Sequence, residues 1–405
     1  MAATQTLFHP GFLDNPYPAY REFQKAGGIH ELDWGSRKLW TIFSYEDCLV
    51  ALKDQRLSSK GFAHLLAVFP EEERAQFSEL MRVMSLWLLF MDAPEHSRLR
   101  KLMNKGFSPA AIDLLRPQVE AIVNRVIDSI GNSSEADLMQ EIAHPLPVIV
   151  IGELLGSSRT MQSQLCEWSD AIARFFGNPN RTIEQTAAAQ DAVVHLTEHF
   201  RQIVAERRRQ KGNDLIGLLL DIEADGETLT EEELYAQRIM LLFAGHETTR
   251  NLIGNGMYSL LCHPQEFTKL QDNPDLIRSS VEEMLRYESP VQYVLRAVKE
   301  EVEICGAQID PGKGVIIVLA AANRDPNRFR DPDFFDLGRV NNPHLAFGGG
   351  PHFCIGNQLA RLEGQACILR MVQRFPKMRL TDRLPSRVEN FAFRGFKSFP
   401  ISLQL

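Results

Sequence analysis

The chain has 405 residues, of which 44% are hydrophobic and 24% charged. This composition is typical of globular proteins and excludes a disordered, collagen-like or coiled-coil chain. A net charge of -8 argues against a general nucleic-acid-binding surface. Length allows two or three domains of about 150 residues. No linker, repeat or composition shift divides the sequence, so we expect one domain over residues 1–405.

The N-terminus lacks the basic and apolar segments of a secretory signal. The longest apolar run, Val315–Ala322, falls far short of the roughly 18 residues that cross a membrane. Six scattered cysteines without a C-x-x-C pair indicate reduced thiols. We therefore expect a soluble cytoplasmic monomer without a membrane anchor.

The predicted elements begin with a short helix opened by Pro16 and Pro18. Ile29–Trp34 and Leu39–Phe43 flank Gly35-Ser36 and predict a hairpin. Helical patterns then dominate to about residue 290, as in an apolar stripe from Leu115 to Ile130. Thr230 and Glu233 form a capping box that starts a helix reaching about Cys262. At 1.5 Å per residue this helix is roughly 48 Å long and should be the spine of the domain.

The pattern changes after Pro290. Short β-type pieces cover 291–298, 302–304 and 314–319, and an irregular stretch follows over 323–351. Loops of that length are usually functional. A last helix is expected over about 355–375. The fold class is therefore mainly α with a minor β region.

The most informative segment is FGGGPHFCIG, residues 347–356. Cys354 lies between a glycine-rich loop and the start of a helix. Glycine allows close approach of a bulky partner. Backbone N–H groups and a helix N-terminus stabilise a thiolate there. A structural cysteine in a glycine-rich turn is the alternative for the cysteine alone.

This segment resembles the F-x-x-G-x-[RH]-x-C-x-G signature of the cytochrome P-450 family, the haem-thiolate monooxygenases. The resemblance implies a single-domain cytochrome P-450 fold, with haem b between the long central helix and the cysteine-loop helix. It makes Cys354 the iron ligand and His352 a partner of a haem propionate. Phe347 would pack beside the thiolate and tune its environment.

Residues 244–249, AGHETT, lie in the middle of the long predicted helix. Alone they indicate a small-residue packing face, because Gly and Thr are poor helix formers. They also resemble the family's A-G-x-[DE]-T motif, in which the helix opens over the haem at Ala244. The resemblance makes Thr248 the hydroxyl at the oxygen site and Glu247 the acid that relays protons inward. His246 is expected to be structural or solvated, not a metal ligand.

Glu283 and Arg286 match E-x-x-R, which alone is a common helix-surface pair of little worth. In the family this pair is buried behind the haem and organises the cysteine loop. Either Arg328 or Arg339 could be its third member. The role of these residues would be structural.

His96 and Arg100 resemble the family's H-x-x-x-R, which binds haem propionates, although a basic solvated helix end fits them equally well alone. Their i,i+4 spacing puts both on one helix face. Arg296 matches another propionate partner. A cluster of His and Arg is the expected counterpart of two carboxylates.

The substrate pocket is the variable part of the family. By position we expect it to be lined by apolar and aromatic residues, each of which ordinary core packing would also explain. They are Leu86, Leu89, Phe176, Leu241, Val291, Val294, Leu295 and Phe393. The expected substrate is therefore an apolar, medium-sized organic molecule.

The resemblance implies an oxidoreductase that inserts one oxygen atom from O2 into such a substrate, by hydroxylation or epoxidation in secondary metabolism. Electrons would come from a separate ferredoxin and reductase, or a flavodoxin. Arg98, Lys101 and Lys105 are expected to belong to the docking surface of that acidic partner. Three alternatives remain: a peroxide-driven enzyme, a non-oxygenating enzyme on the same fold, and a non-catalytic haem-binding protein.

Overall fold

The computed structural model describes residues 10–34, 37–60, 66, 69–177, 181–210 and 229–404. The longer helices are α2 (Tyr17–Lys25), α3 (Tyr45–Ala51), α5 (Ser78–Ser85), α6 (Glu95–Gly106), α7 (Pro109–Asp128), α8 (Pro145–Leu154), α9 (Gln162–Gly177), α10 (Ile183–Arg209), α12 (Glu231–Cys262), α13 (Pro264–Asp272), α14 (Ile277–Tyr287) and α16 (Asn357–Arg374). Shorter turns are α1 (Pro10–Asp14), α4 (Glu71–Arg74), α15 (Leu319–Ala322), η2 (Ala75–Phe77), η3 (Leu88–Phe90), η4 (Met139–Ala143), η5 (Arg159–Met161), η6 (Pro274–Leu276) and η7 (Gly350–His352). None of the helices in these ranges is both long enough and apolar enough to cross a membrane.

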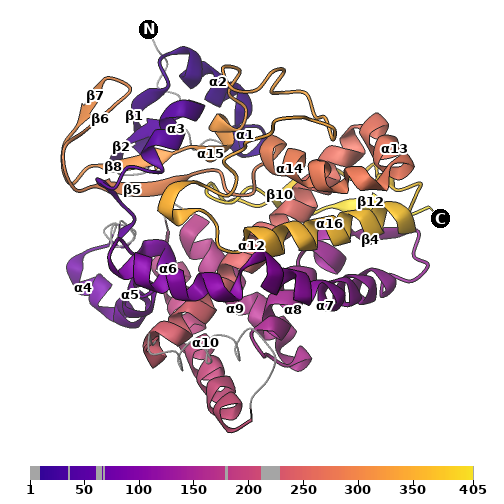
Figure 1. The fold of residues 1–405 in the computed structure, drawn as a ribbon, viewed down its shortest axis with the longest axis horizontal. Coiled ribbons are helices and arrows are strands. Elements are labelled where there is room, and N and C mark those ends of the chain that lie inside the picture. The colour runs from indigo at the N-terminus through magenta and orange to yellow at the C-terminus, as the bar shows by residue number, and fades with distance from the viewer. Residues whose placement is uncertain are drawn as a thin grey trace.

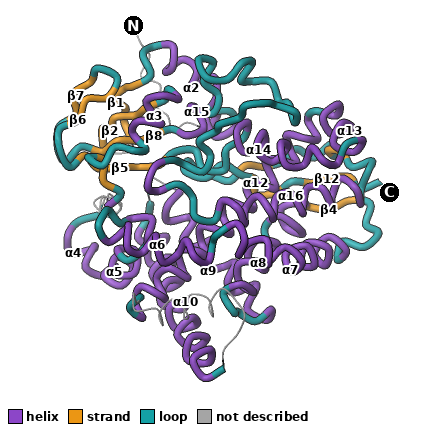
Figure 2. Tube along the Cα trace, viewed as in Figure 1, coloured by secondary structure: helices purple, strands orange, loops and turns teal. Residues whose placement is uncertain are grey.

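The strands are β1 (Ile29–Trp34), β2 (Arg37–Ile42), β3 (Leu57–Ser58), β4 (Glu135–Asp137), β5 (Val294–Val298), β6 (Val302–Ile304), β7 (Ala307–Ile309), β8 (Gly314–Ile317), β9 (Arg379–Leu380), β10 (Ser386–Arg387), β11 (Phe396–Ser398) and β12 (Pro400–Ser402). The largest sheet has the order β1-β2-β8-β5-β3. Figure 2 shows it at one side of a mostly helical molecule, with β4 and β12 on the other side.

The long helix α12 has the predicted bounds. Both halves of its capping box form: the backbone N–H of Glu233 donates to Thr230 Oγ1 (3.2 Å), and that of Thr230 donates to Glu233 Oε2 (2.9 Å). Nearly every residue from Glu233 to Leu261 is buried. The helix is covered by α8, α9, α10, α14 and α16, and it crosses α16 near the middle of the molecule (Figure 1). The expectation of a helical spine is confirmed.

The predicted hairpin is also confirmed, because β1 and β2 pair antiparallel from Ile29↔Ile42 to Trp34↔Arg37. Its turn, 35–36, lies outside the described residues. The strand expected over 291–298 begins only at Val294, since Val291 instead makes an isolated bridge to Phe393. The strand expected over 314–319 ends at Ile317, and its last residue joins the short alanine-rich helix α15.

The hydrophobic core is largely one cluster of buried side chains, with members from Leu66 to Leu403. Two smaller clusters lie at the main sheet and differ by strand face. Val294 and Ile317 pack in one of them, and Leu295 and Ile316 in the other. The alternation follows from the period of two in a strand.

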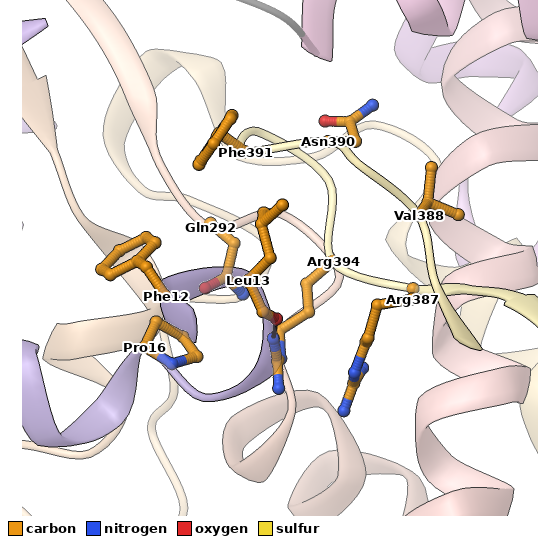
Figure 3. Close-up of a pocket in the computed structure, with 10 residues that line it drawn as sticks. Phe12, Leu13, Pro16, Gln292, Arg387, Val388, Asn390, Phe391 and Arg394 are labelled. Atoms are coloured by element: carbon orange, nitrogen blue, oxygen red, sulfur yellow. Dashed lines mark hydrogen bonds between the residues drawn. The ribbon is translucent and has the colours of Figure 1, made fainter. Parts of the chain in front are cut away.

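The first described helix is tied to the loop between β10 and β11. Arg394 in this loop donates to the carbonyls of Leu13 (2.6 Å) and Asp14 (2.8 Å) and to Glu288 Oε2 (2.6 Å). A small pocket lies at this junction (Figure 3). Its lining comprises Phe12, Leu13, Pro16, Gln292, Arg387, Val388, Asn390, Phe391, Arg394 and Gly395.

Candidate functional site

The loop before α16 turns sharply around Cys354. Gly348 and Gly350 have φ of 70° and 63°, a left-handed conformation that favours glycine. A Cβ at Gly350 would lie 2.5 Å from the carbonyl oxygen of Leu52, so a larger residue would have to push the α3 end away. The N–H of Cys354 donates to the carbonyl of Phe347 (2.9 Å), which ties the backbone of the cysteine to that of Phe347.

Burial and the neighbouring groups act on the pKa of the Cys354 thiol in opposite directions. Burial raises its pKa, while the N–H of Gly356 and the charges of Arg100 and Arg361 act to lower it. Burial prevails, so the net shift of the thiol pKa is upward. A metal ion on sulfur adds positive charge and deprotonates the thiol. Arg361 also lies over Phe347, 4.4 Å from the ring centroid.

Four basic side chains that the sequence predicts as propionate partners are gathered at one place. The rings of His96 and His352 are 4.1 Å apart, and both groups feel the charges of Arg100 and Arg296. Burial and these neighbours lower the pKa of His352 to about 3, and burial lowers that of Arg296 to about 10. Asp92 raises the pKa of both histidines and of Arg296, but it offsets burial and repulsion only in part.

The nearest acid, Asp92, compensates this cluster only in part. Asp92 is already held by the Ser58 hydroxyl (2.5 Å) and the backbone N–H of Ser59 (2.9 Å). Nε2 of His96 is buried and has no hydrogen-bond partner among the described residues. Carboxylates from a bound group would satisfy both the charge and the free nitrogen. The residues present therefore fit the two propionates of a haem.

The middle of α12 is open on one side. Ala244, Gly245 and Thr248 are partly exposed within a helix that is otherwise buried almost throughout. Thr248 Oγ1 donates to the Ala244 carbonyl (2.7 Å), a back-bond that commonly bends helices. This partly exposed face lies at the A-G-x-[DE]-T segment, across which α12 remains a continuous α-helix, so a local opening of the helix stays a prediction.

The neighbouring acid is turned inward. Glu247 is 1% exposed, and its carboxylate contacts Arg250 Nη2 (2.9 Å) and Asn251 Nδ2 (3.0 Å). Burial raises its pKa despite these two partners. A Cβ at Gly395 would lie 1.9 Å from Asn251 Oδ1, so the glycine there allows Asn251 to reach Glu247.

His246 is held by protein groups at both ring nitrogens. Nδ1 is 2.8 Å from Ser169 Oγ, and Nε2 is 3.1 Å from the carbonyl of His144. Its ligand atom lies within 4.8 Å of those of His144 and Cys166. Because both nitrogens already have partners, the contacts agree with the structural role expected from the sequence.

Glu283 and Arg286 form a fully buried pair with two contacts of 2.8 Å. The third member is Arg339, whose Nε lies 3.0 Å from Glu283 Oε2. Arg328, the other candidate, instead lies over the ring of Tyr45. Both partner arginines also donate to backbone carbonyls in the loop after α15.

The predicted pocket residues are only partly brought together. Phe176 stacks on Phe243 of α12 (5.2 Å between centroids), and Phe393 meets the same ring edge-on (5.9 Å). Val291 joins them through its bridge to Phe393. Leu86 and Val294 are half-buried, and Leu241 is buried on α12.

Two of the pocket residues do not follow this arrangement. Leu295 lies on the opposite face of β5 from Val294, because successive strand residues alternate. It packs in the small cluster that contains Ile316. Leu89 is 41% exposed in η3. Strand alternation in the sequence already separates Leu295 from Val294.

The three basic residues expected at the docking surface lie on α6. Arg98, Lys101 and Lys105 are all exposed, and Arg98 also pairs with Glu233 at the start of α12. Sequence reasoning missed the partners of Glu247. Arg250 and Asn251 lie three and four residues after it, a spacing that places them on the same helix face. Asp170, which pairs with Arg250, has no such signal because it comes from α9.

Comparison with known proteins agrees with this geometry. The family model described as cytochrome P450 matches residues 9–390. The monooxygenase PikC of Streptomyces venezuelae is 37% identical over 96% of this chain and 91% of its own length. The vitamin D(3) 25-hydroxylase of Pseudonocardia autotrophica is 36% identical over 98% of this chain and 96% of its own.

A solved structure extends the comparison to three dimensions. P450BioI in complex with acyl carrier protein bearing hexadec-9Z-enoic acid superposes with a TM-score of 0.90 at 34% identity, over 97% of this chain and all of that one. Cytochromes P450 bind haem through a cysteine thiolate. The protein thus belongs to the cytochrome P450 family and is a haem-dependent monooxygenase.

Proposed function

We propose that this protein inserts one oxygen atom of O2 into an apolar, medium-sized organic substrate of secondary metabolism, by hydroxylation or epoxidation. The observation that carries the proposal is the gathering of His96, Arg100, Arg296 and His352, whose positive charge Asp92 balances only in part. Named monooxygenases among the relatives support the oxygen chemistry.

In this proposal Cys354 ligates the haem iron and the four basic side chains hold the propionates. A thiolate-bound haem supplies O–O bond cleavage, which the electron density of the sulfur favours. Arg361, over the Phe347 ring, adds positive charge near the sulfur. Ala244 leaves room on the other side, where α12 is open.

Glu247 and Thr248 supply the proton path. The raised pKa of Glu247 lets its carboxyl hold a proton within the buried interior. Thr248 presents a hydroxyl on the open face of the same helix. A positioned acid and hydroxyl are what proton transfer to a developing oxygen anion requires.

The substrate lies against an aromatic wall in this proposal. Phe176 and Phe393 are held around Phe243, with Leu86, Leu241, Val291 and Val294 around them. Such a lining favours an apolar molecule oriented by few polar contacts. The neighbour with a bound hexadecenoyl carrier protein is an example of a long apolar chain in this fold.

Electrons come from a separate ferredoxin and reductase, or from a flavodoxin. Lys101 and Lys105 are exposed on the helix that carries His96 and Arg100, near Cys354. An acidic partner docked there would lie close to the sulfur side of the site.

The test uses two variants and one control. Cys354→Ala should abolish the thiolate-type Soret band of the reduced carbon monoxide complex, whereas Cys367→Ala, at a buried cysteine of α16, should keep it. A persistent band in the Cys354 variant would disprove the ligand. Thr248→Ala should uncouple reductant use from product formation. An indifferent Thr248→Ala would favour the non-catalytic alternative, and turnover with peroxide alone would favour the peroxide-driven one.

A further inference from the structure

Two carboxylates share one guanidinium at the inner end of Glu247. Arg250 Nη2 lies 2.9 Å from Glu247 Oε2, and its Nη1 lies 2.8 Å from Asp170 Oδ1. The side chains of Glu247, Arg250 and Asp170 are 2%, 10% and 26% exposed, in order from the interior outward. The contacts therefore lead from the edge of the protein to the buried acid.

The outer end of this path is fixed by a histidine. His144 Nε2 is 3.1 Å from Asp170 Oδ2, and the His144 side chain is 25% exposed. The carbonyl of His144 and the hydroxyl of Ser169 hold the ring of His246. The residues preceding α8 and those of α9 are thus pinned against α12 beside Glu247.

A guanidinium cannot act as the proton carrier in this path. Arginine stays charged in proteins and does not give up its proton. Arg250 therefore holds Glu247 in place. The strength of this ion pair depends on how strongly Asp170 competes for the guanidinium. Because Asp170 binds the opposite nitrogen, the two carboxylates divide one positive charge between them.

We propose that Asp170, oriented by His144, is a positioning residue for oxygen activation: by holding Arg250 it keeps the Glu247 carboxyl able to take up a proton and release it toward Thr248. The inference rests on the proposed function for its consequence in turnover. The inference itself concerns how Arg250 is shared between Glu247 and Asp170. This sharing can be measured without turnover, through the pKa of Glu247.

The charges around Glu247 agree with this assignment. Burial raises the pKa of Glu247, and so does the charge of Asp170, while Arg250, the Asn251 hydrogen bond and His144 act to lower it. Burial also acts to raise the pKa of Asp170, but the His144 hydrogen bond and Arg250 outweigh it and hold that pKa far below its usual range.

These groups cover the surroundings of Glu247. They come from its own helix, from α9 and from the residue that precedes α8. Two further titratable groups lie here. Burial is the main cause that lowers the pKa of His246 to about 3 and keeps it neutral, and burial, with the charge of Asp170, raises the pKa of the Cys166 thiol to about 12. Asp170 therefore stays a carboxylate while Glu247 alternates between its two forms.

The first measurement is the titration of Glu247 itself. Holoprotein in the diamagnetic ferrous carbon monoxide form, labelled with 13C at glutamate carboxyls, gives one signal per side chain, assigned by its loss in Glu247→Gln. Asp170→Asn should lower the pKa of Glu247 by about one unit, because Arg250 then serves Glu247 alone. Arg250→Gln should shift it the opposite way, and in this background Asp170→Asn should have a much smaller effect.

Glu153→Gln is the matched control. Glu153 is another partly buried carboxylate shared by two arginines, at 2.9 Å from both Arg125 and Arg159, and it forms no ion pair with the Glu247–Arg250–Asp170 group among the described residues. It should leave the Glu247 signal unchanged. An unchanged titration in Asp170→Asn, or shifts of the same sign in Asp170→Asn and Arg250→Gln, would overturn the proposal. If Asp170→Asn fails to fold, Arg250→Gln serves as the test. The pKa of Glu247 should rise in that variant, and an unchanged pKa would overturn the proposal.

The second measurement is the fraction of electrons recovered in product. Asp170→Asn should lower this fraction severalfold and enlarge the solvent isotope effect, and Asp170→Glu, which restores the charge, should recover most of it. If Glu247→Gln itself leaves the fraction unchanged, the proposed proton path fails, while the titration still decides the role of Asp170. If Glu247→Gln is defective but Asp170→Asn is not, the positioning role is wrong and the proposed function stands.

Discussion

At the scale of single residues, Arg296 is a buried cation that Asp92 acts on and that forms no ion pair among the described residues. It is 8% exposed, it donates to the neighbouring backbone carbonyl of Leu295, and burial lowers its pKa to about 10. A buried cation is costly unless it is paired. We expect Arg296 to pair with a haem propionate. The rate at which haem leaves the protein therefore reports on this pair.

Arg296→Met keeps much of the side-chain volume and removes the charge. Loss of one charge-assisted hydrogen bond is worth about 1.5–3 kcal/mol, so haem should leave roughly 10 to 150 times faster. Transfer of haem to an excess of apomyoglobin measures this rate. Arg330→Met, at a 95% exposed side chain, is the control. Equal rates in the two variants would contradict the assignment of Arg296.

The sequence predicts some of this residue-level arrangement and not the rest. The spacing of His96 and Arg100 places them on one face of a helix whatever the fold. Arg296 comes from a strand and His352 from a loop, so only the family resemblance could group them with the first pair. Arg339 and Arg328 lie in one irregular stretch, and no spacing rule chooses between them. Asp170 and Arg250 meet only because α9 packs on α12.

At the scale of one element, α16 carries a buried acid on its inner side. Glu363 is 2% exposed, and its Oε2 has no hydrogen-bond partner among the residues that the structure describes. Burial raises its pKa well above the usual value. The folded protein therefore keeps this proton at pH values where the unfolded chain has lost it.

The sign of the resulting pH dependence follows from linkage. When the folded state binds more protons than the unfolded state, the free energy of unfolding falls as pH rises above the ordinary pKa of glutamate. Glu363→Gln should remove this part of the slope and stabilise the protein near neutral pH. Denaturant unfolding across that pH range measures it, with exposed Glu389→Gln as control. A slope unaltered by Glu363→Gln would show that Glu363 is not protonated in the fold.

Prediction of elements succeeded where a local signal marks both ends. The capping box and the following Pro264 bracket α12, and its bounds are as expected. The strands after Pro290 were predicted too long, because Val291 finds its partner in a loop a hundred residues later and Leu319 belongs to a helix. Those choices depend on tertiary contacts, which periodicity does not contain.

At the scale of the whole molecule, Glu283 joins α14 to the loop that leads to Cys354. It accepts hydrogen bonds from Arg286, Arg339 and Asn342 and from the backbone N–H of Asp336. All of these donors lie about one fully buried carboxylate. Removing the charge of Glu283 should therefore loosen the loop that leads to Cys354.

Glu283→Gln leaves Arg286 buried without its counter-charge, which typically costs about 3–5 kcal/mol. We expect a strongly lowered midpoint of thermal unfolding by circular dichroism and less haem per chain in the purified protein. Glu198→Gln breaks an exposed pair with Arg201 and should change little. A Glu283→Gln protein that melts like its parent with full haem content would refute the structural role.

The bonds from Arg394 to the carbonyls of Leu13 and Asp14 span 381 and 380 residues of sequence. Contacts of such separation carry a large loop-closure cost and form late in folding. A ribosome delivers residues 13 and 14 long before Arg394 emerges. The loop that carries Phe391 and Phe393 can thus be tied to Leu13 and Asp14 only after Arg394 has left the ribosome, so the N-terminal helix waits for this anchor while some 380 residues are made.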